Sequence, residues 1–476
     1  MKWYRKIQQS VWLEALFICA GLGAHLFYLT HTTFVDWPEM LLYPWFLTKG
    51  LVYYRDVVLA YVPGAYYLLH VLYSLIGYST ASEKLIAYGF ILLTDVLVYL
   101  TARKLTKQVW PSIIALFFFV LWQPIFSGNT IWYETILAPM YLMIYMVAFG
   151  YLEKPRLSRA LSIGLMLAIA TLIKQTAVWP LGTVCLFVWL SHTDKKRGFV
   201  HAVSIGAIAV AANLLVWGYF VLLGAGSQYG FWVFGFLFKL SSSASMYALP
   251  PTRGDITLII PALIPIAVLL LFRQKKQIWL LIALTAALLL SGLPRWGLHR
   301  LQPMLAFISV GVGVGIATMY AAKKRSVVSV GIVLLCLVTL GSWRSFRVFT
   351  VLRDPMQPTF FDARYQELLS YANTHAPGPV YVLGNYDYLY FGRNERPAVL
   401  PWVPLFPWNA QLPGMQKRII TSLESQKVPY ILYIPYHQKD GYYLDYAPAD
   451  LLLYVEAKYE KIGALPVPGG WLYTRK

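Results

Sequence analysis

Apolar runs recur along the chain from residue 11 to residue 345, and they limit its fold more than any other feature. A hydrocarbon core about 30 Å thick is crossed by about 20 apolar residues in an α-helix. Only helices satisfy their own backbone hydrogen bonds in lipid without closing a barrel. With 58% hydrophobic and 13% charged residues, the chain has too little polar surface for a soluble fold. The sequence therefore predicts an α-helical, polytopic transmembrane bundle.

We expect about eleven spans, judged by this length. They are predicted at 11–30, 84–102, 111–127, 134–151, 160–173, 177–191, 200–223, 256–272, 278–293, 301–321 and 326–345. The pair 160–173 and 177–191 is short, and a single broken hairpin is the alternative. The first run has a basic flank but no small-x-small cleavage site, so we interpret it as a retained anchor and not as a signal peptide.

The formal charge of +19 is gathered in short basic clusters between the apolar runs. These clusters are Lys2/Arg5/Lys6, Arg103/Lys104/Lys107, Lys154/Arg156/Arg159, Lys195/Lys196/Arg197, Arg273/Lys275/Lys276 and Lys323/Lys324/Arg325. One orientation places all of them in the cytoplasm, as the positive-inside rule requires. The charge therefore predicts a multi-pass protein of the cell membrane with its N-terminus inside and its C-terminus outside. It indicates contact with membrane lipids and no nucleic-acid partner.

The composition changes after residue 345, where short β-like runs alternate with helical patterns. Strands are predicted at 379–384, 430–435 and 469–475, and amphipathic helices at 415–427 and 447–460. We therefore expect a transmembrane catalytic domain over 1–345 and a small extracytoplasmic α/β domain over 346–476. All three cysteines lie in apolar runs, so no disulfide framework is expected outside the membrane.

Two outer loops are long enough to fold over a site, at 31–83 and 224–255. The first contains two short helical patterns rich in Tyr and Trp, which suit helices lying in the membrane interface. This pattern predicts a lid on the membrane surface.

Few carboxylates face outward in the predicted topology: Asp36, Glu39, Asp56, Glu83, Glu134 and Asp255. Asp36 is the best candidate for a general base, because it lies where the first helix leaves the membrane. The structural alternative is a capping box, since Asp36-x-x-Glu39 precedes an apolar run with Pro38 in its first turn.

Two further acids have structural alternatives of their own. Asp56 follows Arg55, so a local ion pair is the alternative to substrate binding. Glu134 begins a predicted span, where it could complement the helix N-terminus or assist at the site. Asp95 lies in the middle of a span, and we expect a buried structural pair for it.

The outward or intramembrane cations form a complementary set: Lys174, Lys239, Arg253, Arg295, His299 and Arg300. A charge at the bilayer centre costs about 2.5–3.5 kcal/mol on insertion scales, so such side chains usually face a protein interior or a wet cavity. A phosphate at the membrane surface would suit them. The alternative for Arg295 and Arg300 is snorkelling or contact with lipid headgroups.

The sequence contains no recognisable metal or nucleotide motif. It has no His-Glu-x-x-His, no pair of cysteines at ligand spacing, no Asp-x-Asp, no P-loop and no dinucleotide fingerprint. These absences argue against a nucleotide-driven pump. They neither require nor exclude a divalent metal cofactor.

Four features in order resemble the GT-C superfamily of integral-membrane glycosyltransferases, and most closely its protein-mannosyltransferase and lipid A aminoarabinose-transferase branch. They are the acid after the first span (Asp36, then Glu39), the Gly-x-x-Tyr-Tyr-Arg-Asp stretch at 50–56, the Tyr-x-Pro-Gly-x-Tyr-Tyr stretch at 61–67, and the Arg-x-x-x-His-Arg-Leu-x-Pro turn at 295–303. The likeness spans nearly the whole chain.

The resemblance implies an enzyme that moves a sugar from a polyprenyl-phosphate carrier to a glycan, lipid or protein acceptor at the outer membrane face, with inversion. It implies that Asp36 is the base, and we expect Glu39 and Glu134 to assist it. The expected substrate-binding residues are Arg55, Asp56, Tyr54, Lys174, Arg253, Arg295, His299 and Arg300. Trp37, Tyr53 and Tyr54 would offer stacking faces, with interfacial aromatic residues as the alternative.

One stretch departs from the family pattern. Tyr61-Val62-Pro63 stands where the aminoarabinose branch has Glu-Lys-Pro, so the metal-ligand acid and the phosphate lysine of that branch are absent. The resemblance therefore specifies neither the metal nor the sugar.

Two rival functions use the same residues. A transporter or flippase of lipid-linked sugar would need the cations, but the sequence shows no internal repeat of the kind that transporters often have. A non-catalytic membrane protein would bind a partner through its outer domain, whereas the unusual charges concentrate in the membrane part.

Overall fold

The computed structural model describes residues 11–236, 250–270, 275–293, 295–321, 331, 339, 360–384, 386–401, 403, 405–436 and 447–476. The chain divides into two compact units. The first consists of Met1–Phe34, Lys84–Leu214 and Leu249–Met356, and the second of Val35–Glu83, Leu215–Ala248 and Gln357–Lys476. The predicted domain boundary at 345/346 lies outside the described residues and stays a prediction.

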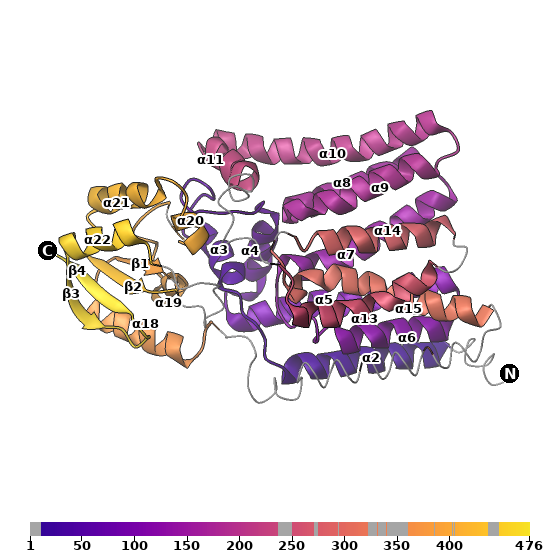
Figure 1. The fold of residues 1–476 in the computed structure, drawn as a ribbon, viewed down its shortest axis with the longest axis horizontal. Coiled ribbons are helices and arrows are strands. Elements are labelled where there is room, and N and C mark those ends of the chain that lie inside the picture. The colour runs from indigo at the N-terminus through magenta and orange to yellow at the C-terminus, as the bar shows by residue number, and fades with distance from the viewer. Residues whose placement is uncertain are drawn as a thin grey trace. The chain divides into compact units, whose positions relative to one another are not determined.

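The first unit is built from helices (Figure 1). These helices are α2 (Val11–His31), α5 (Thr80–Thr106), α6 (Val109–Trp122), α7 (Tyr133–Glu153), α8 (Leu157–Ile173), η1 (Gln175–Ala177), α9 (Val178–Ser191), α10 (Lys195–Leu222), α13 (Arg253–Leu269), α14 (Lys276–Leu290), η3 (Leu298–Leu301) and α15 (Gln302–Ala321). The ends of α5 and α10 extend past the unit boundaries at 83/84 and 214/215. Every predicted span from 11–30 to 301–321 coincides with a helix, whereas 326–345 lies outside the described residues.

Five helical segments among the described residues are long and apolar enough to cross a membrane: α2, α5, α7, α10 and Leu298–Ala321. Other apolar helices, including α6, α8 and α14, are shorter. The fold is therefore a helical one with membrane-spanning character. The number of spans and their orientation stay predictions.

Helix α15 forms the core of the first unit and packs against α6, α7, α13 and α14. Its glycines allow close approach, because a Cβ added at Gly313 would lie 2.6 Å from the carbonyl oxygen of Pro111 in α6. This packing fixes the start of α15, where the turn η3 joins it.

The second unit combines the first outer loop with the C-terminal part of the chain. The loop contains α3 (Pro38–Thr48) and α4 (Gly64–Ile76), which confirms the two helical patterns predicted there. The segment 215–248 adds α11 (Gly226–Gly230) and the π-helical turn η2 (Phe231–Gly235).

The C-terminal part holds a four-stranded sheet with the order β1-β2-β4-β3. Its strands are β1 (Val380–Gly384), β2 (Tyr430–Ile434), β3 (Tyr459–Ala464) and β4 (Trp471–Arg475). The pairing of β1 with β2 is parallel, with Val380 opposite Tyr430, and β4 runs antiparallel to β2 and β3. The accompanying helices are α18 (Ala363–His375), α19 (Leu389–Arg393), α20 (Pro407–Ala410), α21 (Met415–Gln426) and α22 (Ala449–Lys458).

The predicted strands and helices of this part are confirmed, with one correction. The helix predicted over 447–460 ends at Lys458, and β3 begins at Tyr459. Tyr459 pairs with Arg475 of β4, and its buried hydroxyl donates to the carbonyl oxygen of Val428. Strand pairing thus overrides the local helical pattern, because cross-strand contacts decide strand formation more than intrinsic preference does.

The first outer loop is attached to the C-terminal part by contacts within the second unit. The Val58 N–H donates to the carbonyl oxygen of Val403 at 2.9 Å, and Lys49 Nζ donates to Asn394 Oδ1 at 2.6 Å. The rings of Trp45 and Phe391 meet edge to face. The lid predicted on the membrane surface stays a prediction.

Candidate functional site

Lys174 and Glu134 form a buried ion pair in the first unit. Lys174 lies in extended conformation between α8 and η1, and Glu134 lies in the first turn of α7, as predicted. The two side chains are 3% and 2% exposed, and Lys174 Nζ donates to Glu134 Oε1. A buried charge is tolerated only with such a partner, because desolvating each ion costs several kcal/mol. Glu134 therefore neutralises much of the Lys174 charge.

Three more cationic groups come from the connection between α14 and α15. The short helix η3 carries His299 and Arg300, and Arg295 precedes it. His299 lies close enough to Arg300, Lys174 and Arg295 for their charges to act on its imidazole. We call Lys174, Arg295, His299 and Arg300 the cationic cluster. The structure thus brings together four of the six cations that the sequence offered for a phosphate.

The neighbours of the cluster are aromatic. The rings of Trp132 and His299 meet edge to face with centroids 5.8 Å apart, and Lys174 Nζ lies 5.6 Å from the centroid of the Tyr133 ring. Arg300 is buried and Arg295 is half-buried. Lys174 is paired with Glu134, and the cluster contains two arginines besides.

The connection between α6 and α7, residues 123–132, supports this arrangement. Asn129 Nδ2 donates to the Leu29 carbonyl at 2.9 Å and to Thr32 Oγ1 at 2.8 Å, which ties the connection to the end of α2. Gln302 Nε2 donates to the Phe126 carbonyl at 2.8 Å, which ties it to the start of α15. The residues on both sides of the cluster are therefore held by the same connection.

Asp36 lies in the second unit and is buried, with 6% exposure. Its Oδ1 accepts a hydrogen bond from the backbone N–H of Phe360 at 2.9 Å. The capping-box alternative for Asp36 was wrong, because Trp37 holds the N-cap position of α3 and Pro38 is the first helical residue. A chain segment 324 residues away binds the carboxylate instead.

Glu39 lies in the first turn of α3, and a second carboxyl of the same unit interacts with it. Burial, and then the charge of Glu39, raise the pKa of Asp387 to about 7. Backbone N–H groups of Asp387 and Tyr388 oppose this shift of the pKa. Asp387 is not among the candidates predicted from the sequence, although its place directly after the predicted strand 379–384 was a signal.

Arg55 and Asp56 form the predicted local ion pair, with Arg55 Nη2 2.8 Å from Asp56 Oδ2. The same oxygen accepts the Val52 N–H at 2.8 Å. Burial acts to raise the pKa of Asp56, but these hydrogen bonds and the Arg55 charge hold it below its usual value. The pair closes the turn at 52–56, and its role in substrate binding stays a prediction.

The rings of Tyr53 and Tyr54 are buried in this structure. Tyr54 has a positive φ of 67°, donates to the Tyr61 carbonyl at 2.7 Å, and packs edge to face on Phe220 and Tyr229. Tyr53 donates to the Tyr43 carbonyl at 2.8 Å. Both rings therefore pack the loop, and their stacking on a sugar or lipid stays a prediction.

Arg253 is exposed at the first position of α13. The N-terminus of α13 is closed by a capping box between Thr252 and Asp255, so Asp255 has a structural role. Lys239 lies outside the described residues. Phosphate binding by Arg253 stays a prediction.

Asp36 and Glu39 belong to one unit, and the cationic cluster and Glu134 belong to the other. Their predicted juxtaposition therefore stays a prediction. Among the described residues, no three His, Cys, Asp or Glu side chains are grouped closely enough to hold a metal ion.

Solved structures share the fold of this chain. ArnT from Cupriavidus metallidurans in the apo state is 12% identical, with a TM-score of 0.59 over 96% of this chain and 97% of that one. ArnT bound to undecaprenyl phosphate is 11% identical over the same shares, with a TM-score of 0.58.

A second similar structure is the archaeal oligosaccharyltransferase AglB from Archaeoglobus fulgidus in complex with an inhibitory peptide and a dolichol-phosphate. It is 12% identical, with a TM-score of 0.56 over 98% of this chain and 75% of that one. No protein-family model matches the sequence, and the search of curated proteins finds no match. The likeness is therefore one of fold.

Proposed function

We propose that this protein is a membrane glycosyltransferase that transfers a sugar from a polyprenyl-phosphate carrier to an acceptor at the outer membrane face, with inversion. The observation that carries the proposal is the largely buried cationic cluster around His299, in which Lys174 pairs with Glu134. The shared fold supports it, because ArnT was solved with undecaprenyl phosphate and AglB with a dolichol-phosphate.

The cationic cluster would hold the carrier phosphate and stabilise the charge that develops as the sugar leaves it. Arginine suits this task, since its planar guanidinium donates two parallel hydrogen bonds to a phosphate. Arg300 is buried in η3, which joins α15 directly, so helical structure sets its position. A fixed donor of this kind contributes about 10²–10³ to a rate.

Asp36 would act as the base that removes the proton of the acceptor hydroxyl. The Phe360 N–H holds its Oδ1, which orients the carboxylate without supplying a proton. One base suffices for direct displacement at the anomeric carbon, because no covalent enzyme intermediate forms. Glu39 would assist Asp36, and Glu134 would assist through its pairing with Lys174.

The test compares cells that lack the protein with cells that produce the wild type or Asp36→Asn, by mass spectrometry of lipid-linked sugars and glycans. We expect Asp36→Asn to accumulate the polyprenyl-phosphate sugar as the empty strain does, at wild-type protein levels. Asp450→Asn, at an exposed position in the first turn of α22, is the matched control and should behave as wild type.

Two outcomes would overturn the proposal. Normal transfer by Asp36→Asn would remove Asp36 as the base. An Asp36→Asn protein whose cells instead lose the carrier-linked sugar from the outer leaflet, without a change in any glycan, would favour the transporter alternative.

A further inference from the structure

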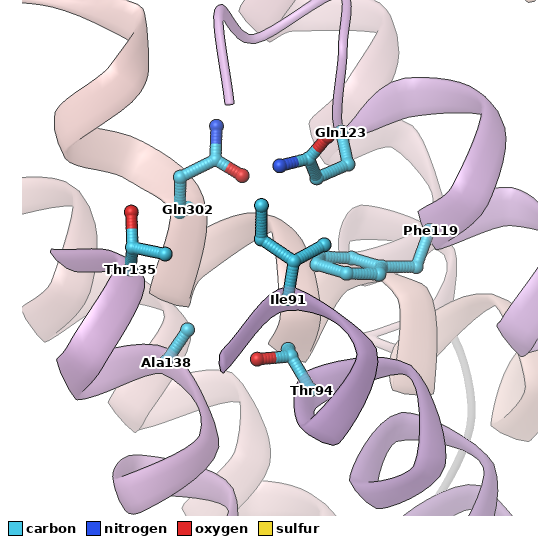
Figure 2. Close-up of a pocket in the computed structure, with 7 residues that line it drawn as sticks. All are labelled: Ile91, Thr94, Phe119, Gln123, Thr135, Ala138 and Gln302. Carbon is cyan, nitrogen blue, oxygen red and sulfur yellow. The ribbon is translucent and has the colours of Figure 1, made fainter. Parts of the chain in front are cut away.

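A small polar cavity lies inside the first unit, between α5, α6, α7 and α15. Its lining residues, drawn in Figure 2, are Ile91, Thr94, Phe119, Gln123, Thr135, Ala138 and Gln302. The cavity volume of about 10 Å³ matches what one water molecule needs. Four of the seven lining side chains are polar, which is the condition for a cavity to be wet and not empty.

Gln302, the first residue of α15, presents an acceptor to this cavity. Its Nε2 donates to the Phe126 carbonyl at 2.8 Å, which fixes the orientation of the amide. Its Oε1 is buried and accepts no hydrogen bond from any described residue. In Figure 2 this oxygen and the Gln123 nitrogen point toward one another across the cavity. A buried amide oxygen is costly unless a donor satisfies it.

Gln123, the residue after α6, presents a donor from the other side. Its Oε1 lies 3.2 Å from His25 Nε2, so its amide nitrogen is left for the cavity. His25 Nδ1 lies 2.8 Å from Asp95 Oδ2, which confirms the buried structural pair predicted for Asp95. All three side chains are fully buried.

The protons of this pair can be counted. With the Gln123 oxygen toward His25, Nε2 carries one proton and donates it. A second proton lies between Nδ1 and the Asp95 carboxyl, so the pair is neutral overall whether it is written as imidazolium and carboxylate or as imidazole and carboxylic acid. A neutral pair suits burial among apolar helices. Gln123 continues this series of hydrogen bonds from His25 toward the cavity.

We propose that the cavity binds one water molecule, which accepts a hydrogen bond from Gln123 Nε2 and donates one to Gln302 Oε1. The hydroxyls of Thr94 and Thr135 donate to backbone carbonyls at 2.8 and 3.0 Å, so their lone pairs remain for the second hydrogen of the water. The result is a continuous buried chain: Asp95, His25, Gln123, water and Gln302.

This series of hydrogen bonds positions the cationic cluster. That part of the inference rests on the proposed function. Gln302 follows η3 directly, so a shift of its amide moves Arg300, two residues earlier. Thr135 follows Glu134 in the same turn of α7. The water thus holds Gln302 beside the turn that carries Arg300, and Thr135, which follows the acid partner of Lys174, lines the same cavity. Gln302 is therefore a positioning residue.

The first test is a double-mutant cycle in the full-length protein, purified in detergent, with Gln123→Met, Gln302→Met and both together. Each change keeps the length of the side chain and removes its amide. We expect each single variant to lower the melting temperature by several degrees and the double variant to lower it by less than the sum, because either change already breaks the water bridge. Gln366→Met, at an exposed position in α18, is the control and should not change it.

The second readout is the Kd for undecaprenyl phosphate in the same preparations. Gln302→Met should weaken binding several-fold, and Gln123→Met should do so although it lies beyond the water. Melting losses that simply add would overturn the water bridge. Coupled melting losses with unchanged Kd values would overturn the positioning step alone. A wild-type protein that does not bind undecaprenyl phosphate would count against the proposed function. The double-mutant cycle would still test the water bridge.

If a methionine variant fails to fold, a wild-type structure that shows ordered waters tests the water bridge instead. Density bridging Gln123 and Gln302 is expected. A dry cavity or a direct bond between the two amides would overturn the proposal.

Discussion

At the scale of single residues, partners far away in the sequence set the chemistry of each charged group. Lys174 would be too costly to bury alone, and Glu134, 40 residues earlier, makes it tolerable. Asp36 has the same dependence on a distant segment, since Phe360 holds its carboxylate. Asp387 shows the reverse effect, because burial, and then the nearby charge of Glu39, disfavour its ionised form.

Replacing one partner of the Lys174–Glu134 pair should lower the stability of the protein more than replacing both partners. Lys174→Met leaves Glu134 as a buried, uncompensated charge and should cost about 3–5 kcal/mol. Adding Glu134→Gln should restore most of the melting temperature, yet binding of undecaprenyl phosphate should remain weak. Arg197→Met, in the exposed Arg197–Asp194 pair, should have little effect on melting. A single Lys174→Met variant as stable as the wild type would contradict the buried pairing.

The raised pKa of Asp387 should make the second unit less stable at higher pH. Between about pH 4 and pH 7 the folded carboxyl keeps its proton while the unfolded one has lost it, so stability falls as pH rises through this range. Asp387→Asn should flatten this dependence, as measured by melting or by hydrogen exchange in β1 across the pH series. Asp450→Asn should keep the wild-type slope. Parallel pH profiles for wild type and Asp387→Asn would refute the shift of the pKa.

At the scale of elements, glycines decide how closely backbones approach. Gly313 lets α15 lie against α6, and Gly384 ends β1 where it meets β2. Gly384 has a φ of 128°, and a Cβ there would overlap the carbonyl oxygen of Ile434. Backbone atoms cannot move aside as the end of a side chain can.

Gly384→Ala should therefore disrupt the parallel pairing of β1 and β2. We expect hydrogen exchange of the β1 and β2 amides to rise sharply and the C-terminal part to melt earlier. Gly414→Ala is the matched control: its φ is also positive, at 75°, but a Cβ there meets nothing, so only the left-handed strain of about 1–2 kcal/mol applies. Equal effects of the two changes would show that steric overlap with β2 is unimportant.

At the scale of the whole molecule, orientation in the membrane decides which side the proposed site faces. By the positive-inside rule, the basic clusters predict that the C-terminal part lies outside. A C-terminal tag should therefore react with a membrane-impermeant reagent in intact cells. Lys196→Cys, in a basic cluster, should react only after lysis. The opposite pattern would invert the topology and move the proposed reaction to the cytoplasmic face.

The sequence by itself determined where the long helices lie, because an apolar run of span length is a local property that tertiary contacts need not complete. It also singled out Asp36, Lys174 and the 295–303 turn, since charges among apolar residues stand out in any window. Only the tertiary structure decided their partners. The Glu134 pair, the Phe360 hydrogen bond, the hydrogen bonds from Asp95 through His25 to Gln123, and the attachment of loop 35–83 to the C-terminal part all join distant segments. No local pattern encodes which distant group meets which, because that depends on how the helices pack.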